Sequence, residues 1–177
     1  MATPQTEFVH WKSADPNGAT GCLGPVTLTG PMGTAFFFKD DYPGFGSTAF
    51  NPPLAATGMV EIVGAAGHEF KATFTIPLKN PVFYLGSLSS TLTFTQVTPA
   101  TTVIQVTRVS GDADFKVTGN QVTGKVFQPP PGSTAPTDSN GIVRLTGTLT
   151  SVTFTLTPNP GSTNPREGVF LQIGGTP

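Results

Sequence analysis

The chain has 177 residues, enough for one domain with a single buried core. Its formal net charge is −1 and only 11% of its residues are charged, so it lacks the basic surface expected of a nucleic-acid-binding protein. No apolar run has the length of a membrane-spanning helix, so we expect no membrane span.

Apolar and hydroxyl-bearing residues alternate along most of the chain. In Ser151-Val-Thr-Phe-Thr-Leu-Thr157 the apolar side chains fall on one side of an extended strand and the threonines on the other. Gly and Pro recur every few residues, and no stretch keeps a helical period. We therefore expect strands, in chain order, at residues 7–12, 19–23, 25–29, 34–38, 58–64, 69–76, 82–88, 90–96, 102–110, 115–118, 121–127, 142–150, 152–157 and 168–173.

These short strands predict an all-β fold, an antiparallel β-sandwich of jelly-roll type, in one domain over residues 1–177. Gly119-Asn120 is a candidate two-residue hairpin turn, because both residue types tolerate positive φ. Residues 64–68 are a second candidate hairpin turn, and long loops are expected near residues 40–56 and 128–140. The predicted interior consists of Val26, Leu28, Phe36, Phe38, Ile62, Phe70, Phe74, Ile76, Val82, Tyr84, Leu92, Phe94, Ile104, Val106, Leu145, Leu149, Phe154, Leu156, Phe170 and Ile173.

Cys22 is the one cysteine, so an intrachain disulfide is impossible. We expect it to be a small buried core residue. The chain starts Met1-Ala-Thr-Pro-Gln5, without a basic and apolar leader. The protein is therefore either cytosolic or begins after a removed signal peptide, and the scarcity of charge favours the second, with an extracellular or cell-surface location.

Four stretches of the chain carry strand and turn motifs that follow one another in a recognisable order: residues 9–30, 74–88, 109–124 and 141–154. Their strand and turn motifs, including Val9-His-Trp-Lys-Ser-Ala14, resemble those of bacterial exported β-sandwich domains. Such domains occur in proteins with C-terminal sorting signals and in large adhesin-like surface proteins. The resemblance implies a non-enzymatic surface or matrix module, and the Phe-rich residues 34–41 depart from it.

Short acidic groups in predicted turns are candidate metal ligands. Calcium binds carboxylate, amide and carbonyl oxygens, so we expect calcium as an optional ligand and no required cofactor. Asp and Asn also bond their own backbone in turns, which is the alternative role. The candidates are Asp40 with Asp41, Asp112 with Asp114, and Asp138 with Asn140.

Aromatic rings in the first long loop are candidate sugar-binding residues. Tyr42 and Phe45 are best placed, with Asp40, Asp41 and Asn51 as polar partners. Packing inside the core is the alternative for these rings. It is the stronger expectation for Trp11 and Tyr84, which lie in predicted strands, and Phe50 is a further candidate.

Residues for acid–base chemistry are few. His10 and His68 lack the spacing of known metal sites, and we expect surface or hydrogen-bonded histidines. No Gly-x-Ser-x-Gly motif occurs, and Glu7, Glu61, Glu69 and Glu167 are all the glutamates. These observations favour a protein that is not an enzyme.

Three functional hypotheses follow. The first is a non-catalytic extracellular binding or adhesion module that contacts a glycan or a surface protein through residues 40–54, with calcium as a possible aid. The second is a structural subunit of a self-assembling surface layer or fibre, that is, a homo-oligomer. The third is a hydrolase built on the aspartates.

Overall fold

The computed structural model describes residues 6–38, 47–54, 58–65, 67–126, 138–163 and 167–177. Within these ranges the chain forms strands and turns without a helix, and every strand pairing is antiparallel. The all-β class is confirmed. The strands are β1 (Glu7–Phe8), β2 (His10–Asp15), β3 (Gly18–Cys22), β4 (Pro25–Thr29), β5 (Met32–Phe38), β6 (Met59–Gly64), β7 (Glu69–Leu88), β8 (Ser90–Thr98), β9 (Val106–Gly111), β10 (Lys116–Thr118), β11 (Gln121–Thr123), β12 (Ser139–Leu145), β13 (Thr148–Pro158) and β14 (Glu167–Thr176).

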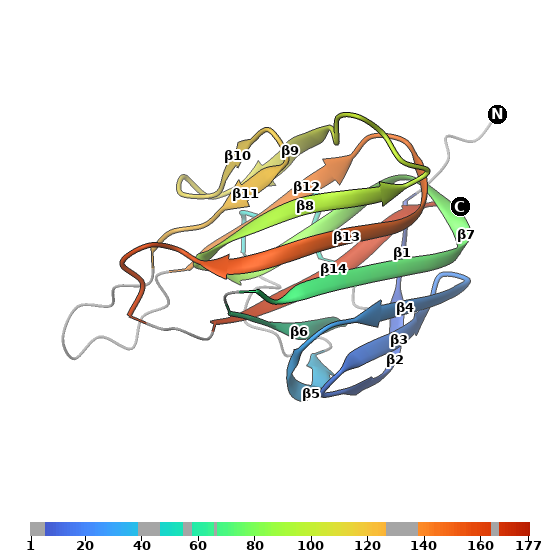
Figure 1. Cartoon of the computed structure of the whole chain (residues 1–177), viewed down its shortest axis with the longest axis horizontal. Coiled ribbons are helices and arrows are strands. Elements are labelled where there is room, and N and C mark those ends of the chain that lie inside the picture. Colours follow the sequence, from blue (N-terminus) through green and yellow to red (C-terminus); the bar gives the residue numbers. More distant parts are fainter. Residues whose placement is uncertain (1–5, 39–46, 55–57, 66, 127–137, 164–166) are drawn as a thin grey trace.

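The strands join into one large antiparallel sheet. Its main path runs β10-β11-β8-β13-β7-β14-β6-β5, and β2, β3 and β4 are added to β7 through β4. β12 pairs with β7 and β9, and β1 pairs with β14. In Figure 1, β8, β13, the first part of β7 and β4 run side by side. The expected C-terminal strand, β14, does return to the sheet.

β7 contains 20 residues and links two parts of the sheet (Figure 1). Its first part pairs with β4 and β13, and its second part pairs with β12 and β14. The predicted division into strands 69–76 and 82–88 is therefore wrong. The chain changes partners there without ending the strand, and Asn80 adopts φ +49°. The Asn80 Oδ1 accepts a hydrogen bond from the Gly147 N–H at 2.9 Å, which fixes this region to the β12–β13 turn.

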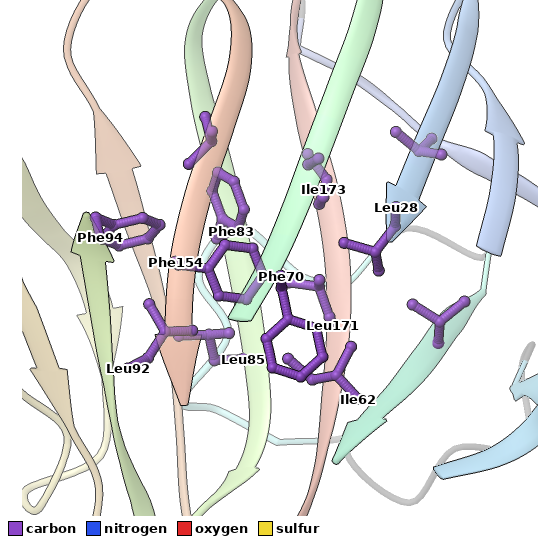
Figure 2. Packing of buried hydrophobic residues seen from close by; sticks show 14 of the residues in the cluster. Leu28, Ile62, Phe70, Phe83, Leu85, Leu92, Phe94, Phe154, Leu171 and Ile173 are labelled. Atoms are coloured by element: carbon purple, nitrogen blue, oxygen red, sulfur yellow. The ribbon is translucent and has the colours of Figure 1, made fainter. Parts of the chain in front are cut away.

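Four phenylalanine rings lie at the centre of the main core (Figure 2). Phe70 and Phe154 stack with centroids 5.3 Å apart, and Phe83 meets Phe94 edge-on at 5.3 Å. Phe154 also contacts Phe83 and Phe94, each at 6.0 Å. Since Phe70 and Phe83 come from the two parts of β7, one core serves both parts of the sheet.

Most of the predicted interior is buried, with one clear error. Ile76 is 44% exposed, because the pairing of β7 with β13 skips from Leu78 to Thr73 and leaves Ile76 in the irregular stretch. Ile104, Val106 and Phe170 are only half-buried, and the side chains of Phe36 and Phe38 lie outside the described part of the chain. The confirmed positions are Val26, Leu28, Ile62, Phe70, Phe74, Val82, Tyr84, Leu92, Phe94, Leu145, Leu149, Phe154, Leu156 and Ile173.

The turns follow the sequence in part. Thr118 pairs with Gln121 across Gly119-Asn120, so the predicted two-residue hairpin is confirmed. Residues 64–68 do not close a hairpin, because β6 pairs with β5 and β14 instead of β7. The expected boundary near residue 151 is also wrong: the turn lies at residues 146–147, before β13 begins.

Hydroxyl groups occupy the face of the sheet opposite the phenylalanine core. Direct cross-strand partners place one row of them across β2, β3, β4, β7, β13 and β8. This hydroxyl row consists of Ser13, Thr20, Thr27, Thr73, Ser151 and Thr98.

Candidate functional site

A cleft of about 290 Å³ lies over the second part of β7. Its walls come from β1, β7, β9, β12 and residues 47–54, which we call the proline segment. Most of the lining is apolar, and Arg144 is the one charged residue among the described residues that line it. The residues used below are Phe8, Pro52, Pro53, Tyr84, Val109 and Arg144.

The alternation of two paired strands places the floor of the cleft. Tyr84 on β7 lies opposite Ile142 on β12, and Val82 lies opposite Arg144. Residues two apart share one face of a sheet, so these four side chains lie together. Phe83, between Val82 and Tyr84, belongs to the main core on the other face. Both faces of this part of the sheet therefore carry apolar side chains.

A second, smaller core cluster packs beneath the cleft. Buried side chains of the proline segment, Phe50 and Leu54, contribute to it. Val82 and Tyr84 were expected in a single interior, but they belong to this second cluster. Small apolar clusters of this kind are common under long loops. Its buried members are Phe50, Leu54, Met59, Val82, Tyr84 and Ile142.

Tyr84 holds the aromatic side of the cleft. Its ring meets Phe8 edge-on at 5.4 Å and Phe50 at 5.9 Å with an angle of 34°. Burial raises the pKa of Tyr84 to about 12 from its usual 10.0, and the positive charge of Arg144 opposes that rise. The phenol therefore keeps its proton at neutral pH and offers a hydroxyl group to the cleft.

Ser110 on β9 holds the proline segment in place. Its Oγ accepts a hydrogen bond from the Asn51 N–H at 3.0 Å and donates one to the Ala49 carbonyl at 2.7 Å. Together with the burial of Phe50 and Leu54, these bonds fix the segment against the sheet. The adjacent prolines, at positions 52 and 53, stay exposed and form one wall.

Gly174 on β14 makes room for Phe8. It pairs directly with Phe8, and a Cβ built at Gly174 would lie 2.8 Å from the Phe8 Cδ1 and 2.8 Å from the Glu7 carbonyl oxygen. Contacts this short do not occur in relaxed structures, so a side chain at position 174 would displace the ring. Gly174 thus determines the position of the Phe8 ring, which forms a wall of the cleft.

The predicted sugar-binding loop is described only at its end. Asp40, Asp41, Tyr42 and Phe45 lie outside the described residues, so their predicted role stays a prediction. Asn51 is described and exposed, and its backbone makes the bond to Ser110.

Two of the predicted metal ligands, Asp112 and Asn140, are brought together by the fold. The Asp112 Oδ2 accepts a hydrogen bond from the Asn140 N–H at 2.6 Å, and its Oδ1 accepts from the Asp114 and Phe115 N–H groups. The Asn140 Oδ1 accepts from the Ser87 N–H at 3.1 Å. These oxygens thus have the turn-forming role that was the alternative to calcium binding.

The other two predicted ligands have different surroundings. Asp114 forms an ion pair with Lys125 at 3.8 Å, with both side chains about half exposed (51%). Burial raises the pKa of Asp138, and its Oδ1 is buried without a hydrogen-bond partner. Among the described residues, no three His, Cys, Asp or Glu side chains group as metal ligands, and calcium binding stays a prediction.

The remaining candidate rings and histidines mostly have structural roles. Trp11 and Phe50 are buried, as core packing requires. His68 bonds the Val63 carbonyl through Nδ1 at 2.8 Å, and His10 is exposed. Cys22 was expected in the core but is only half-buried, because it lies on the solvent side of β3 opposite His10.

Phe8, Arg144 and the two prolines were not predicted as site residues from the sequence. One signal was present: apolar residues on both faces of β12, at Ile142 and Val143, indicate a strand that is covered on both sides. Contacts between distant parts of the chain determine which segment covers the second face of β12.

Comparisons of the chain with protein-family models, with curated proteins and with solved structures gave no match. In the part of the chain that the structure describes, no helix is long and apolar enough to cross a membrane.

Proposed function

We propose that the chain is a non-catalytic, exported binding module that contacts a glycan or a surface protein at the cleft beside Tyr84. The observation that carries this proposal is the cleft itself, where the proline segment, β1 and β12 meet over a buried aromatic cluster. Concave, mainly apolar sites with a few polar groups are the usual form of ligand sites.

The shape of the lining favours a sugar ring. Half-buried Phe8 and the exposed prolines 52 and 53 present flat apolar surfaces, which suit the C–H face of a pyranose. Tyr84 and Arg144, which also line the cleft, supply hydrogen-bond donors. The apolar wall thus provides contact area, and the polar groups fix the orientation of the ring.

We further propose that the sheet is closed into a β-sandwich of jelly-roll type. Support comes from β7, whose two parts pair with different strands while their rings share one core. In such a fold, loops at the ends and edges of the sheets carry binding residues, and the proline segment has this position.

A glycan array followed by calorimetry tests the binding function. We expect Phe8→Ala to weaken binding of the selected glycan at least about tenfold, since it removes one wall of the cleft. Val103→Ala, which removes an apolar side chain that is 69% exposed elsewhere, is the matched control and should bind normally. Equal binding by both variants would place the ligand at another site.

The array is run with calcium and with a chelator, and the bound glycan is then checked for cleavage. Binding that disappears with the chelator would support the calcium ligands proposed from Asp112, Asp114, Asp138 and Asn140. Release of shorter sugars would contradict a non-catalytic module and favour the hydrolase hypothesis.

A structural subunit of a self-assembling layer is the second candidate. The hydroxyl row carries no charge across six strands, so like-charge repulsion would not oppose contact between copies along this row. Light scattering measures the mass, and exposed Thr27→Lys should dissociate an assembly built on this face. A monomer at all concentrations would overturn this candidate.

A further inference from the structure

Arg144 differs from the other described arginine in its surroundings. Arg108 uses its Nη2 to donate hydrogen bonds to the Gly111 and Asp112 carbonyls at 2.7 and 2.8 Å. The side chain of Arg144 is exposed and forms no ion pair or hydrogen bond with the described residues. Arg108 therefore stabilises a turn, whereas the described residues leave the donors of the Arg144 guanidinium unused.

The position of Arg144 directs those donors to the cleft. It lies opposite Val82 on β7 and two residues from Ile142, and both of these side chains line the cleft. Its charge acts on the phenol of Tyr84, whose pKa it lowers against the effect of burial. The guanidinium and the phenol therefore face the same space.

The charge of the lining is unbalanced. The described residues that line the cleft include Arg144 and no carboxylate, so a neutral ligand would leave its positive charge without a partner. A guanidinium binds a carboxylate through two parallel hydrogen bonds, and this pairing is stronger and more specific than a bond to a hydroxyl group. An anion with a carboxylate complements this lining.

The size of the cleft limits the ligand. A volume of about 290 Å³ lies just below the roughly 300–1,000 Å³ that is typical of small-molecule sites. One sugar ring suits this space better than several. Its apolar face would rest on Phe8 and the prolines, with the guanidinium of Arg144 in the same cleft.

We infer that the cleft recognises an acidic glycan, with the carboxylate of one uronate residue paired to Arg144 and the sugar ring packed against Phe8 and Pro53. This inference rests on the proposed glycan-binding function. The Tyr84 hydroxyl supplies a further donor to the ring.

Calorimetry with two matched disaccharides, a glucuronate-containing one and its glucose counterpart of the same linkage, tests the inference. We expect the acidic disaccharide to bind at least about tenfold more tightly, as one bidentate charged pair implies. Arg144→Gln should remove this preference while the neutral disaccharide binds as before. Arg144→Lys should restore only part of it, because an ammonium cannot form the two parallel bonds.

Lys116→Gln is the control for charge, since it changes the net charge by the same amount at an exposed position on β10, away from the residues that line the cleft. If it removes the preference as fully as Arg144→Gln, the effect is a general field and the inference is overturned. Circular dichroism of each variant confirms folding, and Arg144 is exposed, so its replacement should leave the core intact.

The remaining outcomes separate this inference from the proposed function. Equal binding of both disaccharides, weakened alike by Phe8→Ala, would overturn the acidic ligand but keep the glycan-binding module. No binding of any glycan would overturn both the inference and the glycan-binding form of the proposed function, and would leave a surface protein as the partner to test. Binding of benzoate as tightly as the uronate, lost in Arg144→Gln, would show a carboxylate site that is not specific for sugars, and would also overturn the inference.

Discussion

The pKa of Tyr84 measures directly how far the cleft shields its phenol from water. The chain contains two tyrosines, so Tyr42→Phe leaves Tyr84 as the only source of a tyrosinate signal. We expect this signal to appear with a midpoint near pH 12 instead of the usual 10.0, because burial disfavours the charged phenolate. Arg144→Gln in the same background should move the midpoint higher still, since the guanidinium favours the phenolate.

The same shift predicts how stability changes with pH. The folded-state pKa of Tyr84 is raised, so its contribution is complete below pH 10 and is lost as the pH rises from 10 to about 12. Two pKa units correspond to about 2.7 kcal/mol, and solvent in the open cleft reduces this to about 1–2 kcal/mol. Urea unfolding at pH 9 and pH 11, with Tyr84→Phe as the reference, measures the difference.

The titration is followed by ultraviolet absorbance, with circular dichroism at each pH to monitor the fold. A midpoint near pH 10 in a chain whose circular dichroism is still native would refute the reasoning, because the phenol would then be in water. An unchanged midpoint in Arg144→Gln would show that the guanidinium does not face Tyr84. The structural basis of the acidic-ligand inference would then be lost.

Three substitutions test other parts of the fold. Phe154→Ala removes a fully buried ring that contacts three others, and we expect it to lower the free energy of unfolding by about 3–5 kcal/mol. The control Thr157→Ala, at an exposed position of the same strand, should lower it by less than about 0.5 kcal/mol. Similar values for the two variants in urea unfolding would contradict the packing. Gly174→Ala should displace the ring of Phe8 and alter the near-ultraviolet circular dichroism, whereas an unchanged spectrum would argue against the close contact. Ser110→Ala removes both hydrogen bonds to the proline segment. We expect faster amide hydrogen exchange in the proline segment and a free energy of unfolding lower by about 1–2 kcal/mol. Unchanged exchange would show that Ser110 does not hold the segment.

The features that depend on local alternation and turn chemistry could be predicted from the sequence. The apolar positions of residues 151–157 are buried in β13, and the Gly119-Asn120 turn closes the β10–β11 hairpin. In both cases a few adjacent residues determine the outcome, because side chains alternate with a period of two and a two-residue turn needs positive φ. Such signals do not depend on the rest of the chain.

The continuity of β7 could not be predicted in this way. Pro77 and Pro81 normally interrupt a strand, since proline has no N–H to donate. Here Pro77 lies in the gap between Leu78 and Thr73 in the pairing with β13, and Pro81 lies between Lys79 and Val82 in the pairing with β14. The missing donors thus fall where the hydrogen-bond ladder is already interrupted, a fact that depends on two distant partner strands.

The alternation of apolar and polar residues that predicts the core does not predict the cleft. Val143 and Leu145 on β12 face the main core, so the usual pattern assigns the alternate positions, 142 and 144, to solvent. Ile142 is nevertheless buried, because the proline segment covers that end of the strand, whereas Arg144 is exposed at the edge of this cover. A buried apolar residue and an exposed arginine two positions apart on one face mark the edge of a covered surface. There, apolar contact area and a charge without an ion-pair partner among the described residues occur together, as binding a ring with a carboxylate requires.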